Sequence, residues 1–228
     1  NASARHLLAA LEGKASSEVP SDYVRKLFDG YAGDFEHHLV GKLEYQTPQK
    51  LHDLLEELIR DRQADMDVID LGCGTGLCGP LFRKHAGFLK GVDLSPGMLA
   101  KAGERDIYDE LVEGDLTVGL GTAGDVYDLV IAADVFVYVG ELGQVFEATA
   151  RALRPGGLFA FSLEAEESGE DFVLRPTGRY AHSLGYARRL AEAAGLQEIR
   201  LEKSVLRKDK GQQPIEGYLV VLGKPPVD

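Results

Sequence analysis

The sequence is short of the residues that build disulfide frameworks, zinc sites and membrane spans. Its 228 residues include two cysteines, Cys73 and Cys78, and no tryptophan. Two cysteines are too few for a disulfide framework or a four-ligand zinc site, and they are typical of a reducing, cytoplasmic location. No apolar run approaches the roughly 18 residues of a membrane span. We also find no metal-ligand spacing, so the sequence predicts a cytoplasmic protein without a metal or a membrane partner.

Basic charge is scarce as well. The chain has 25 Lys and Arg against 37 Asp and Glu, a formal net charge of -12. Such a surface repels phosphate backbones and anionic membranes, so we expect a small-molecule partner and no nucleic acid. One basic stretch, RLEKSVLRKDK at residues 200–210, is interpreted as a solvated strand and turn.

Apolar runs alternate with amphipathic segments along most of the chain. Five strand-like runs, several of them near-uniformly apolar, predict a parallel sheet covered on both faces; they lie at residues 66–72, 88–94, 108–116, 126–135 and 158–164. The intervening segments predict helices at residues 51–59, 78–87, 95–104, 141–153 and 183–195. Thr47 and Pro48 are predicted to cap and begin the first of these helices.

The last two strand-like stretches depart from this alternation. Residues 196–207 and 215–223 are separated by a short polar loop. Because that loop has no room for a crossover helix, we expect the two strands to pair as an antiparallel hairpin at one edge of the sheet.

A glycine-rich turn follows the first predicted strand, in VIDLGCGTGLCG at residues 68–79. A strand that runs through such a turn into a helix exposes backbone N–H groups and lets a ligand approach closely. Residues 74–79 match the G-x-G-x-x-G fingerprint of dinucleotide binding, and Asp93 ends the next strand, where a carboxylate can bind ribose hydroxyls. Alternatively, Asp93 caps the helix that begins at Ser95. This reading of the glycines leaves an NAD-dependent oxidoreductase open.

Five motifs then occur in order: DLGCGTG, GVDLSPGML, EGDL, DLVIAADVFVYV and LRPGGLFAFS, within residues 66–163. Together they resemble the motifs of the class I S-adenosylmethionine (SAM)-dependent methyltransferases. The resemblance implies a Rossmann-like α/β fold with a seven-stranded sheet, parallel except for an antiparallel last strand, and helices on both faces. The terminal hairpin agrees with that last strand, whereas a nicotinamide-binding sheet normally ends in parallel strands. The implied cofactor is SAM, with S-adenosylhomocysteine (SAH) as product.

The same resemblance implies a set of cofactor-binding residues. Asp70 orients the amino group of the methionine end, Asp93 binds the ribose, and Asp115 holds the adenine amino group with Leu116 beside the ring. The full set is Tyr31, Asp70, Gly72, Cys73, Gly74, Gly76, Asp93, Leu94, Met98, Asp115, Leu116 and Ala133. Cys73 and Cys78 are expected to be small buried side chains.

Residues 23–51 and 172–196 resemble a narrower group of bacterial predicted methyltransferases that often carry tetratricopeptide repeats upstream. In such proteins short N-terminal helices fold over the cofactor, which implies a helical lid in residues 1–46 and a catalytic domain in residues 47–228. Of the lid candidates Tyr23, Tyr31 and Phe35, we favour Tyr31. The resemblance also implies a protein partner, bound through repeats upstream of Asn1.

The candidates for chemistry at the methyl acceptor lie mostly after the fourth and fifth strands. His182, His38 and Tyr180 are candidate general bases; Arg179 is a candidate clamp for an acidic acceptor. Asp134 and Tyr138 are placed where the fold brings acceptor and methyl together. Alternatively, His182 bonds near an N-cap at Ser183, and Asp134 is a turn residue. The remaining histidines His6, His52 and His85 are expected at the surface.

The sequence therefore predicts a methyltransferase that moves a methyl group from SAM to a small molecule. Two alternatives stay open: an NAD-dependent oxidoreductase, and a non-catalytic module that binds the cofactor without transferring its methyl group.

Overall fold

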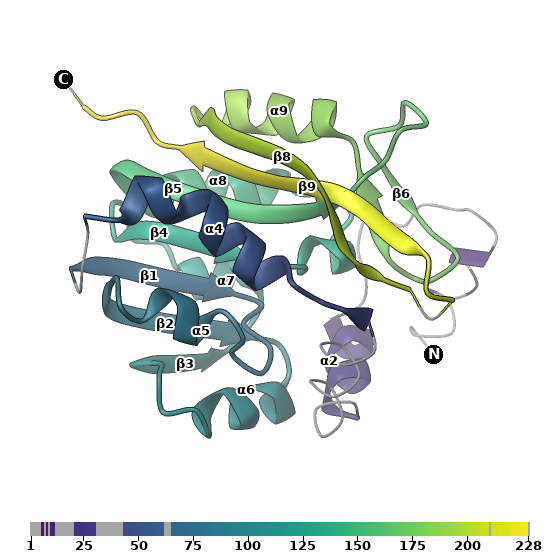
Figure 1. Cartoon of the computed structure of the whole chain (residues 1–228), viewed down its shortest axis with the longest axis horizontal. Coiled ribbons are helices and arrows are strands. Elements are labelled where there is room, and N and C mark those ends of the chain that lie inside the picture. Colours follow the sequence, from purple (N-terminus) through teal and green to yellow (C-terminus); the bar gives the residue numbers. More distant parts are fainter. Residues whose placement is uncertain are drawn as a thin grey trace.

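The computed structural model describes residues 21–30, 43–61, 65–209 and 211–227, together with His6, Leu8, Ala10 and Leu11. Its centre is a seven-stranded sheet with the order β3-β2-β1-β4-β5-β9-β8 (Figure 1). The strands are β1 (Met66–Leu71), β2 (Ala86–Asp93), β3 (Glu110–Glu113), β4 (Tyr127–Ala132), β5 (Leu153–Glu164), β8 (Gln197–Lys208) and β9 (Pro214–Gly223).

The predicted terminal hairpin is confirmed. β9 pairs antiparallel with both β5 and β8, whereas the pairs among β1 to β5 are parallel. β9 thus enters the sheet between β5 and β8. The last strand is antiparallel, as the predicted fold class requires.

Helices cover both faces because the central strands are apolar on both sides; every residue of β4 is buried. α4 (Thr47–Ile59) and α5 (Gly79–Phe82) pack on one face. α7 (Leu116–Leu120), α8 (Gly143–Ala152) and α9 (Leu184–Ala193) pack on the other. α6 (Pro96–Gly103) packs against β2 and β3 at the opposite end of the sheet from β8 (Figure 1). No helix of the described residues is long and apolar enough to cross a membrane.

Two smaller elements lie beyond the sheet edge where the parallel strands end. A hairpin of β6 (Phe172–Leu174) and β7 (Tyr180–His182) was not predicted from the sequence. α2 (Ser21–Asp29) lies in the predicted N-terminal lid segment and ends just before Gly30. Its Val24 packs against Leu174 and Tyr180 of the hairpin.

Several local predictions need correction. Gln46, not Thr47, is the N-cap of α4; Thr47 is the first helical residue, and its hydroxyl donates to the carbonyl oxygen of Leu206 at 3.3 Å. α5 has only four residues, and the strand that follows it begins at Ala86 rather than Phe88.

The three histidines expected at the surface are buried. The ring of His52 lies 5.4 Å from Phe82 and 6.0 Å from His85, so the two histidines pack between α4 and α5. His6 makes a hydrogen bond of 3.0 Å with the carbonyl oxygen of Gly178 and is also buried. The spacing of apolar residues in α4 predicted that His52 lies on the polar, solvent-facing side of the helix. In the structure, Phe82 and His85 lie against His52 and cover it.

Candidate functional site

Four aspartates mark the edge where neighbouring parallel strands end. Asp70 lies in β1, Asp93 ends β2, Asp115 follows β3 and Asp134 follows β4. The carboxyl ends of the strands in an open α/β sheet are where ligands bind, close to the point where the strand order reverses. Here the order reverses between β1 and β4, so both sides of that point carry acids.

The glycine turn between β1 and α5 needs glycine for two different reasons. Gly72 and Gly74 have φ of +66° and +54°, a left-handed backbone that other residues adopt at a cost. A Cβ at Gly72 would clash with Val135, so this glycine allows close packing against the turn after β4. A Cβ at Gly74 would meet no other atom within 4 Å. The turn therefore has open space beside Gly74.

Asp93 reaches across to this glycine turn. One carboxylate oxygen accepts a hydrogen bond from the Gly74 N–H at 2.9 Å, and the other accepts one from the Ser95 N–H at 2.8 Å. The cap of α6 is Ser95, as predicted, because its hydroxyl accepts from the N–H of Met98. Burial raises the pKa of Asp93. The carboxylate keeps lone pairs for further donors, so Asp93 can still accept hydrogen bonds from ribose hydroxyls, the role that the sequence predicts for it.

Asp70 is buried beneath the glycine turn. It accepts a hydrogen bond of 2.7 Å from the hydroxyl of Tyr108, a residue that sequence reasoning missed. Burial raises the pKa of Asp70 to about 7. Cys73 and Cys78 are buried as expected, and burial also raises the pKa of each thiol.

The remaining predicted cofactor residues lie along the same edge. Asp115 caps α7 by accepting from the Val118 N–H at 2.8 Å, which places Leu116 at the start of that helix. The other members are Gly76 in the glycine turn, Leu94 after β2, Met98 in α6 and Ala133 after β4. Tyr31 and His38 lie outside the described residues.

Helix α2 is fixed to the segment that carries Asp93. The Arg25 Nε donates to the carbonyl oxygen of Leu94 at 3.2 Å, and its guanidinium pairs with Glu113 at the end of β3. Asp29 accepts from the Ser95 hydroxyl at 2.6 Å and from the Gly97 N–H at 3.2 Å. α2 thus bridges the ends of β2 and β3, where the predicted lid would lie.

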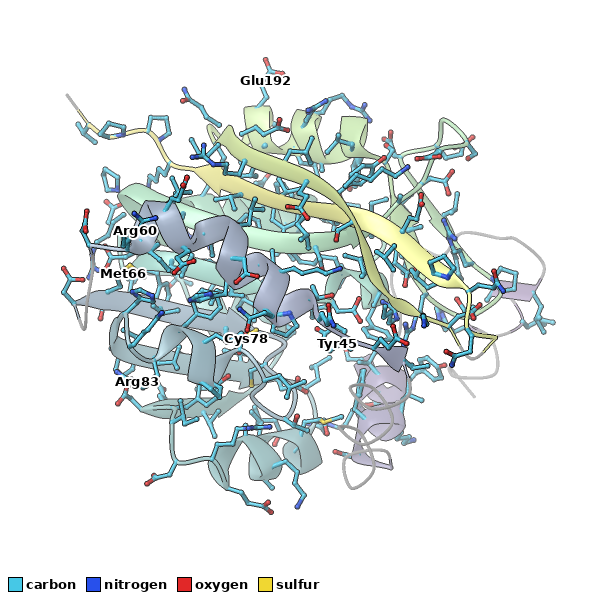
Figure 2. The ribbon with its side chains drawn as sticks, in the orientation of Figure 1. Tyr45, Arg60, Met66, Cys78, Arg83 and Glu192 are labelled. Atoms are coloured by element: carbon cyan, nitrogen blue, oxygen red, sulfur yellow. The ribbon has the colours of Figure 1, made fainter. Side chains whose placement is uncertain are left out.

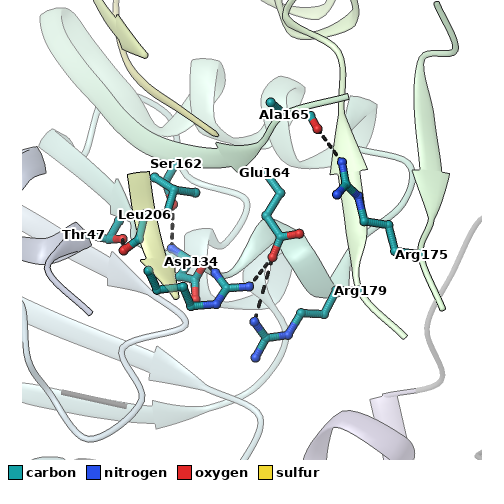
Figure 3. Close-up of polar contacts among 9 residues, drawn as sticks. Thr47, Asp134, Ser162, Glu164, Ala165, Arg175, Arg179 and Leu206 are labelled. Carbon is teal, nitrogen blue, oxygen red and sulfur yellow. Dashed lines mark hydrogen bonds and ion pairs between the residues drawn. The ribbon is translucent and has the colours of Figure 1, made fainter. Parts of the chain in front are cut away.

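A group of charged residues occupies the other side of the edge; we call Asp134, Glu164, Arg179 and Arg207 the acceptor-side cluster. Arg207 donates to Asp134 Oδ1 at 2.7 Å and also pairs with Glu164. The Arg179 Nη1 lies 3.8 Å from Glu164 Oε1. Figure 3 shows Asp134, Glu164 and Arg179 converging from different elements. Burial acts to lower the pKa of Arg207, but the carboxylates of Asp134 and Glu164 outweigh it and raise that pKa.

Arg207 was predicted to be part of a solvated strand and turn, and the structure corrects that interpretation. Residues 197–203 of β8 are exposed, but Arg207 is 3% exposed. The pairing with β9 shifts register between Val205 and Arg207. A bulge breaks the alternation of a strand, so Leu206 and Arg207 are both buried although they are adjacent. The sequence carries no signal for this bulge.

The predicted acceptor residues lie together. Asp134 has a left-handed backbone, with φ of +57°, and its N–H donates to the Ser162 hydroxyl at 2.8 Å. The guanidinium of Arg179 lies 5.7 Å from the ring centroid of Tyr138. The ring centroids of Tyr138 and of Phe28 in α2 lie 5.1 Å apart in an edge-to-face arrangement. Asp134, Tyr138 and Arg179 are therefore part of one neighbourhood, and Asp134 is also a turn residue.

Tyr45, just before α4, connects the two sides of the edge and was missed by the sequence analysis. Burial raises its pKa well above the usual value, and the nearby carboxylate of Asp134, the Cys78 thiol and the Asp70 carboxylate raise it further. Figure 2 shows Tyr45 next to Cys78 below the start of α4. Its phenol thus lies within electrostatic reach of both the acid under the glycine turn and the acid of the acceptor-side cluster.

His182 and Tyr180 lie in β7 and are fully buried. The Nε2 of His182 makes a hydrogen bond of 3.0 Å with the carbonyl oxygen of Gly140, and burial lowers the pKa of His182 to about 4. The His182 ring stacks at 6.2 Å on Tyr186, and Ser183 caps α9, as the alternative interpretation of this segment expected. His182 is therefore neutral at pH 7 within an aromatic group.

Comparisons with known proteins agree with this arrangement. Residues 69–161 match the model of the methyltransferase domain. Human methyltransferase-like protein 27 is 34% identical over 102 residues, which cover 43% of this chain and 40% of that protein. The 18S rRNA (guanine-N(7))-methyltransferase of Bos taurus is 38% identical over 53 residues, which cover 23% of this chain and 19% of that protein. The chain thus spans less than half the length of either relative.

A solved structure with the same fold contains a bound nucleoside product. The magnesium protoporphyrin IX methyltransferase of Synechocystis PCC 6803, with bound SAH, superposes with a TM-score of 0.66 at 18% identity, over 90% of this chain and 99% of that one. Residues 69–161 are therefore similar to a methyltransferase domain, and the chain shares the fold of this solved methyltransferase.

Proposed function

We propose that the protein binds SAM across the ends of β1, β2 and β3 and transfers its methyl group to a small molecule at the ends of β4 and β5. The observation that carries this proposal is the open space beside Gly74, with Asp93 bonded to its N–H. A nucleoside can approach the backbone closely there, because no side chain of the described residues fills the space.

Each acid on the cofactor side has a part of SAM to bind in this proposal. Asp93 accepts hydrogen bonds from the ribose hydroxyls, Asp115 accepts one from the adenine amino group, and Leu116 lies beside the adenine ring. Asp70 and the Gly72 turn orient the methionine end. Bound SAM supplies a methyl carbon that its sulfonium already activates, so alignment of the acceptor accounts for much of the rate.

On the acceptor side, Asp134, Tyr138 and Arg179 are the proposed binding residues. The catalytic predictions for His182 and Tyr180 stay proposals. A histidine with a pKa of about 4 is a weak base at pH 7, so its burial favours a packing role, and Asp134 is the better-placed acceptor for a proton. The prediction for His38 falls outside the described residues.

The order of the strands distinguishes the SAM-dependent proposal from the nicotinamide-dependent alternative. The sheet of nicotinamide-binding enzymes has the order 3-2-1-4-5-6, with the sixth strand beside the fifth. Here the antiparallel β9 takes that place, which favours SAM. Because one relative acts on rRNA, the exclusion of nucleic acid stays a prediction that rests on the net charge. The cytoplasmic location and a protein partner bound through upstream repeats likewise stay predictions.

Calorimetric titration with SAM, SAH and NAD in parallel tests the cofactor. We expect micromolar binding of SAM and SAH and no binding of NAD. Binding of NAD alone would contradict the proposal and favour the oxidoreductase, and binding of none of the three would contradict the proposal as well.

Two variants test the role of Asp93, the residue on which the cofactor proposal depends. Asp93→Ala is expected to weaken SAH binding by about 10- to 100-fold, because hydrogen bonds to a charged group contribute about 1.5–3 kcal/mol. Asp53→Ala, an exposed acid on α4, is the matched control and should bind SAH like the parent. Equal affinity of the two variants would remove Asp93 from the site.

A further inference from the structure

The two arginines of the acceptor-side cluster differ in how many hydrogen bonds their side chains make. Arg207 uses both terminal nitrogens, one on Asp134 and one on Glu164. The guanidinium of Arg179 makes no hydrogen bond with a described residue; its Nη1 lies 3.8 Å from Glu164 Oε1, and the guanidinium lies 5.7 Å from the ring centroid of Tyr138. A guanidinium has five N–H donors in a fork that fits a carboxylate. Arg179 therefore has its donors available for a ligand.

The position of Arg179 supports this. Its side chain is 27% exposed, whereas that of Arg207 is 2% exposed. The turn that carries it is fixed by backbone hydrogen bonds of 2.8 Å from the Arg175 N–H to Arg179 and from the Gly178 N–H to Arg175. The guanidinium is thus held in place by the turn and by Tyr138 while one side stays open.

The acids of the cluster also have capacity left. Asp134 receives Arg207 on Oδ1, and its side chain is 11% exposed. A carboxylate has roughly four lone-pair positions, so Asp134 can accept another donor. Its backbone hydrogen bond to Ser162 and its left-handed conformation fix it in place.

The charges of the cluster balance. Asp134 and Glu164 carry two negative charges, and Arg179 and Arg207 carry two positive charges. A buried charge without a partner is costly. A ligand with one net charge would upset this balance, whereas a ligand with one charge of each sign would preserve it.

We propose that the methyl acceptor is a zwitterion of the amino-acid type, whose carboxylate binds Arg179 and whose ammonium group binds Asp134. This inference rests on the proposed function, because it places the acceptor beside the methyl group of SAM. β1 and β4 are paired neighbours, with Asp70 opposite Ile131, so the end of β1 on the cofactor side lies beside the turn after β4 that carries Asp134.

The test compares ligands that share a skeleton and differ only in charge. The SAH-loaded protein is titrated by calorimetry with L-phenylalanine, phenethylamine and 3-phenylpropanoate, and then with L-alanine, ethylamine and propanoate. In at least one series the zwitterion should bind 10-fold or more tightly than both singly charged analogues. The proposal is wrong if neither zwitterion binds, or if neither exceeds its analogues.

Two arginine variants identify the contact. Arg179→Gln should weaken binding of the preferred zwitterion at least 10-fold and leave binding of the matching amine unchanged. Arg188→Gln, an exposed arginine of α9 paired with Glu198, is the control and should retain the parent preference. If Arg179→Gln melts like the parent and keeps the preference, the carboxylate binds elsewhere and the proposal is overturned.

SAH binding to the same sample separates this inference from the proposed function. If SAH binds and the zwitterions do not, only the zwitterion proposal fails. If SAH does not bind, the proposed function fails, and the same titrations on the ligand-free protein still decide between the zwitterions and their analogues.

Discussion

The two sides of the strand edge are built in opposite ways. On the cofactor side, the glycine turn, Asp70, Asp93 and Asp115 each come from a short stretch that joins a strand to the next helix, and backbone N–H groups make many of the contacts. The acceptor-side cluster instead draws its residues from positions as far apart as Asp134 and Arg207 and consists of buried side-chain ion pairs.

This difference teaches which parts of a site sequence motifs describe. A turn that binds a ligand through its own backbone is formed by consecutive residues, so these residues appear together in the sequence. A cluster of buried charges forms only when distant strands pair in the correct register. The predictions below test the two sides separately.

The largest effect is expected from Arg207→Ala on the acceptor side. Removal of one partner from a buried ion pair costs about 3–5 kcal/mol, because the remaining charges lose their counter-ion. Unfolding in guanidinium chloride should show that loss. Arg200→Ala on the same strand is the control: its guanidinium is exposed and lies 3.8 Å from Glu57, so the free energy of unfolding should change by less than about 1 kcal/mol. Similar losses in both variants would contradict the buried network.

On the cofactor side, Asp70→Asn should stabilise the protein at high pH. The folded pKa of Asp70, about 7, lies above the usual aspartate value of 3.8. The unfolded chain therefore loses this proton first, and the parent loses stability as pH rises from 3.8 to 7, by about 4 kcal/mol in total.

Denaturant unfolding between pH 4 and pH 8 measures the difference between Asp70→Asn and the parent. The advantage of the variant should grow with pH and then level off above pH 7. SAH binding should weaken in the same variant if Asp70 orients the methionine end. An advantage that does not depend on pH would show that burial does not hold the proton on Asp70.

His182 gives a pH dependence of the opposite sign. Its folded pKa, about 4, lies below the usual histidine value of 6.5, so the unfolded chain binds the proton more readily. Stability should fall by about 3 kcal/mol as pH drops from 6.5 to 4. His182→Gln, which does not titrate, should remove that part of the slope in unfolding experiments at pH 7 and pH 4.5. An unchanged slope would assign the acid sensitivity to other groups.

The smallest effect is expected from the link between α2 and the cofactor side. Asp29→Ala removes the acceptor of the Ser95 and Gly97 hydrogen bonds. Exposed polar contacts are worth about 0.2–1 kcal/mol, so the release rate of SAH in stopped-flow displacement should rise by no more than about fivefold. Asp22→Ala, an exposed acid near the start of the same helix, should leave that rate unchanged. Equal rates in all three proteins would mean that α2 does not act as a lid.

Much of the fold was predictable because its signals are local. Strand β4 is apolar throughout since it is buried on both faces, and Ser95 and Pro96 mark the start of α6 by cap chemistry alone. The hairpin β6–β7 was not predictable in the same way. Its strands have three residues each, too few for a periodic pattern, and packing against α2 and β5 decides their conformation.

The sequence by itself determined the order of strands and helices, the antiparallel end of the sheet and the positions of the acids that follow β1 to β4. Each of these depends on neighbouring residues, on loop length or on turn chemistry. The tertiary structure decided that Arg207 faces inward and that Tyr45, His52 and His85 are buried. The direction of those side chains depends on a bulge and on layers supplied by distant segments, and the residues beside them in the chain do not encode it.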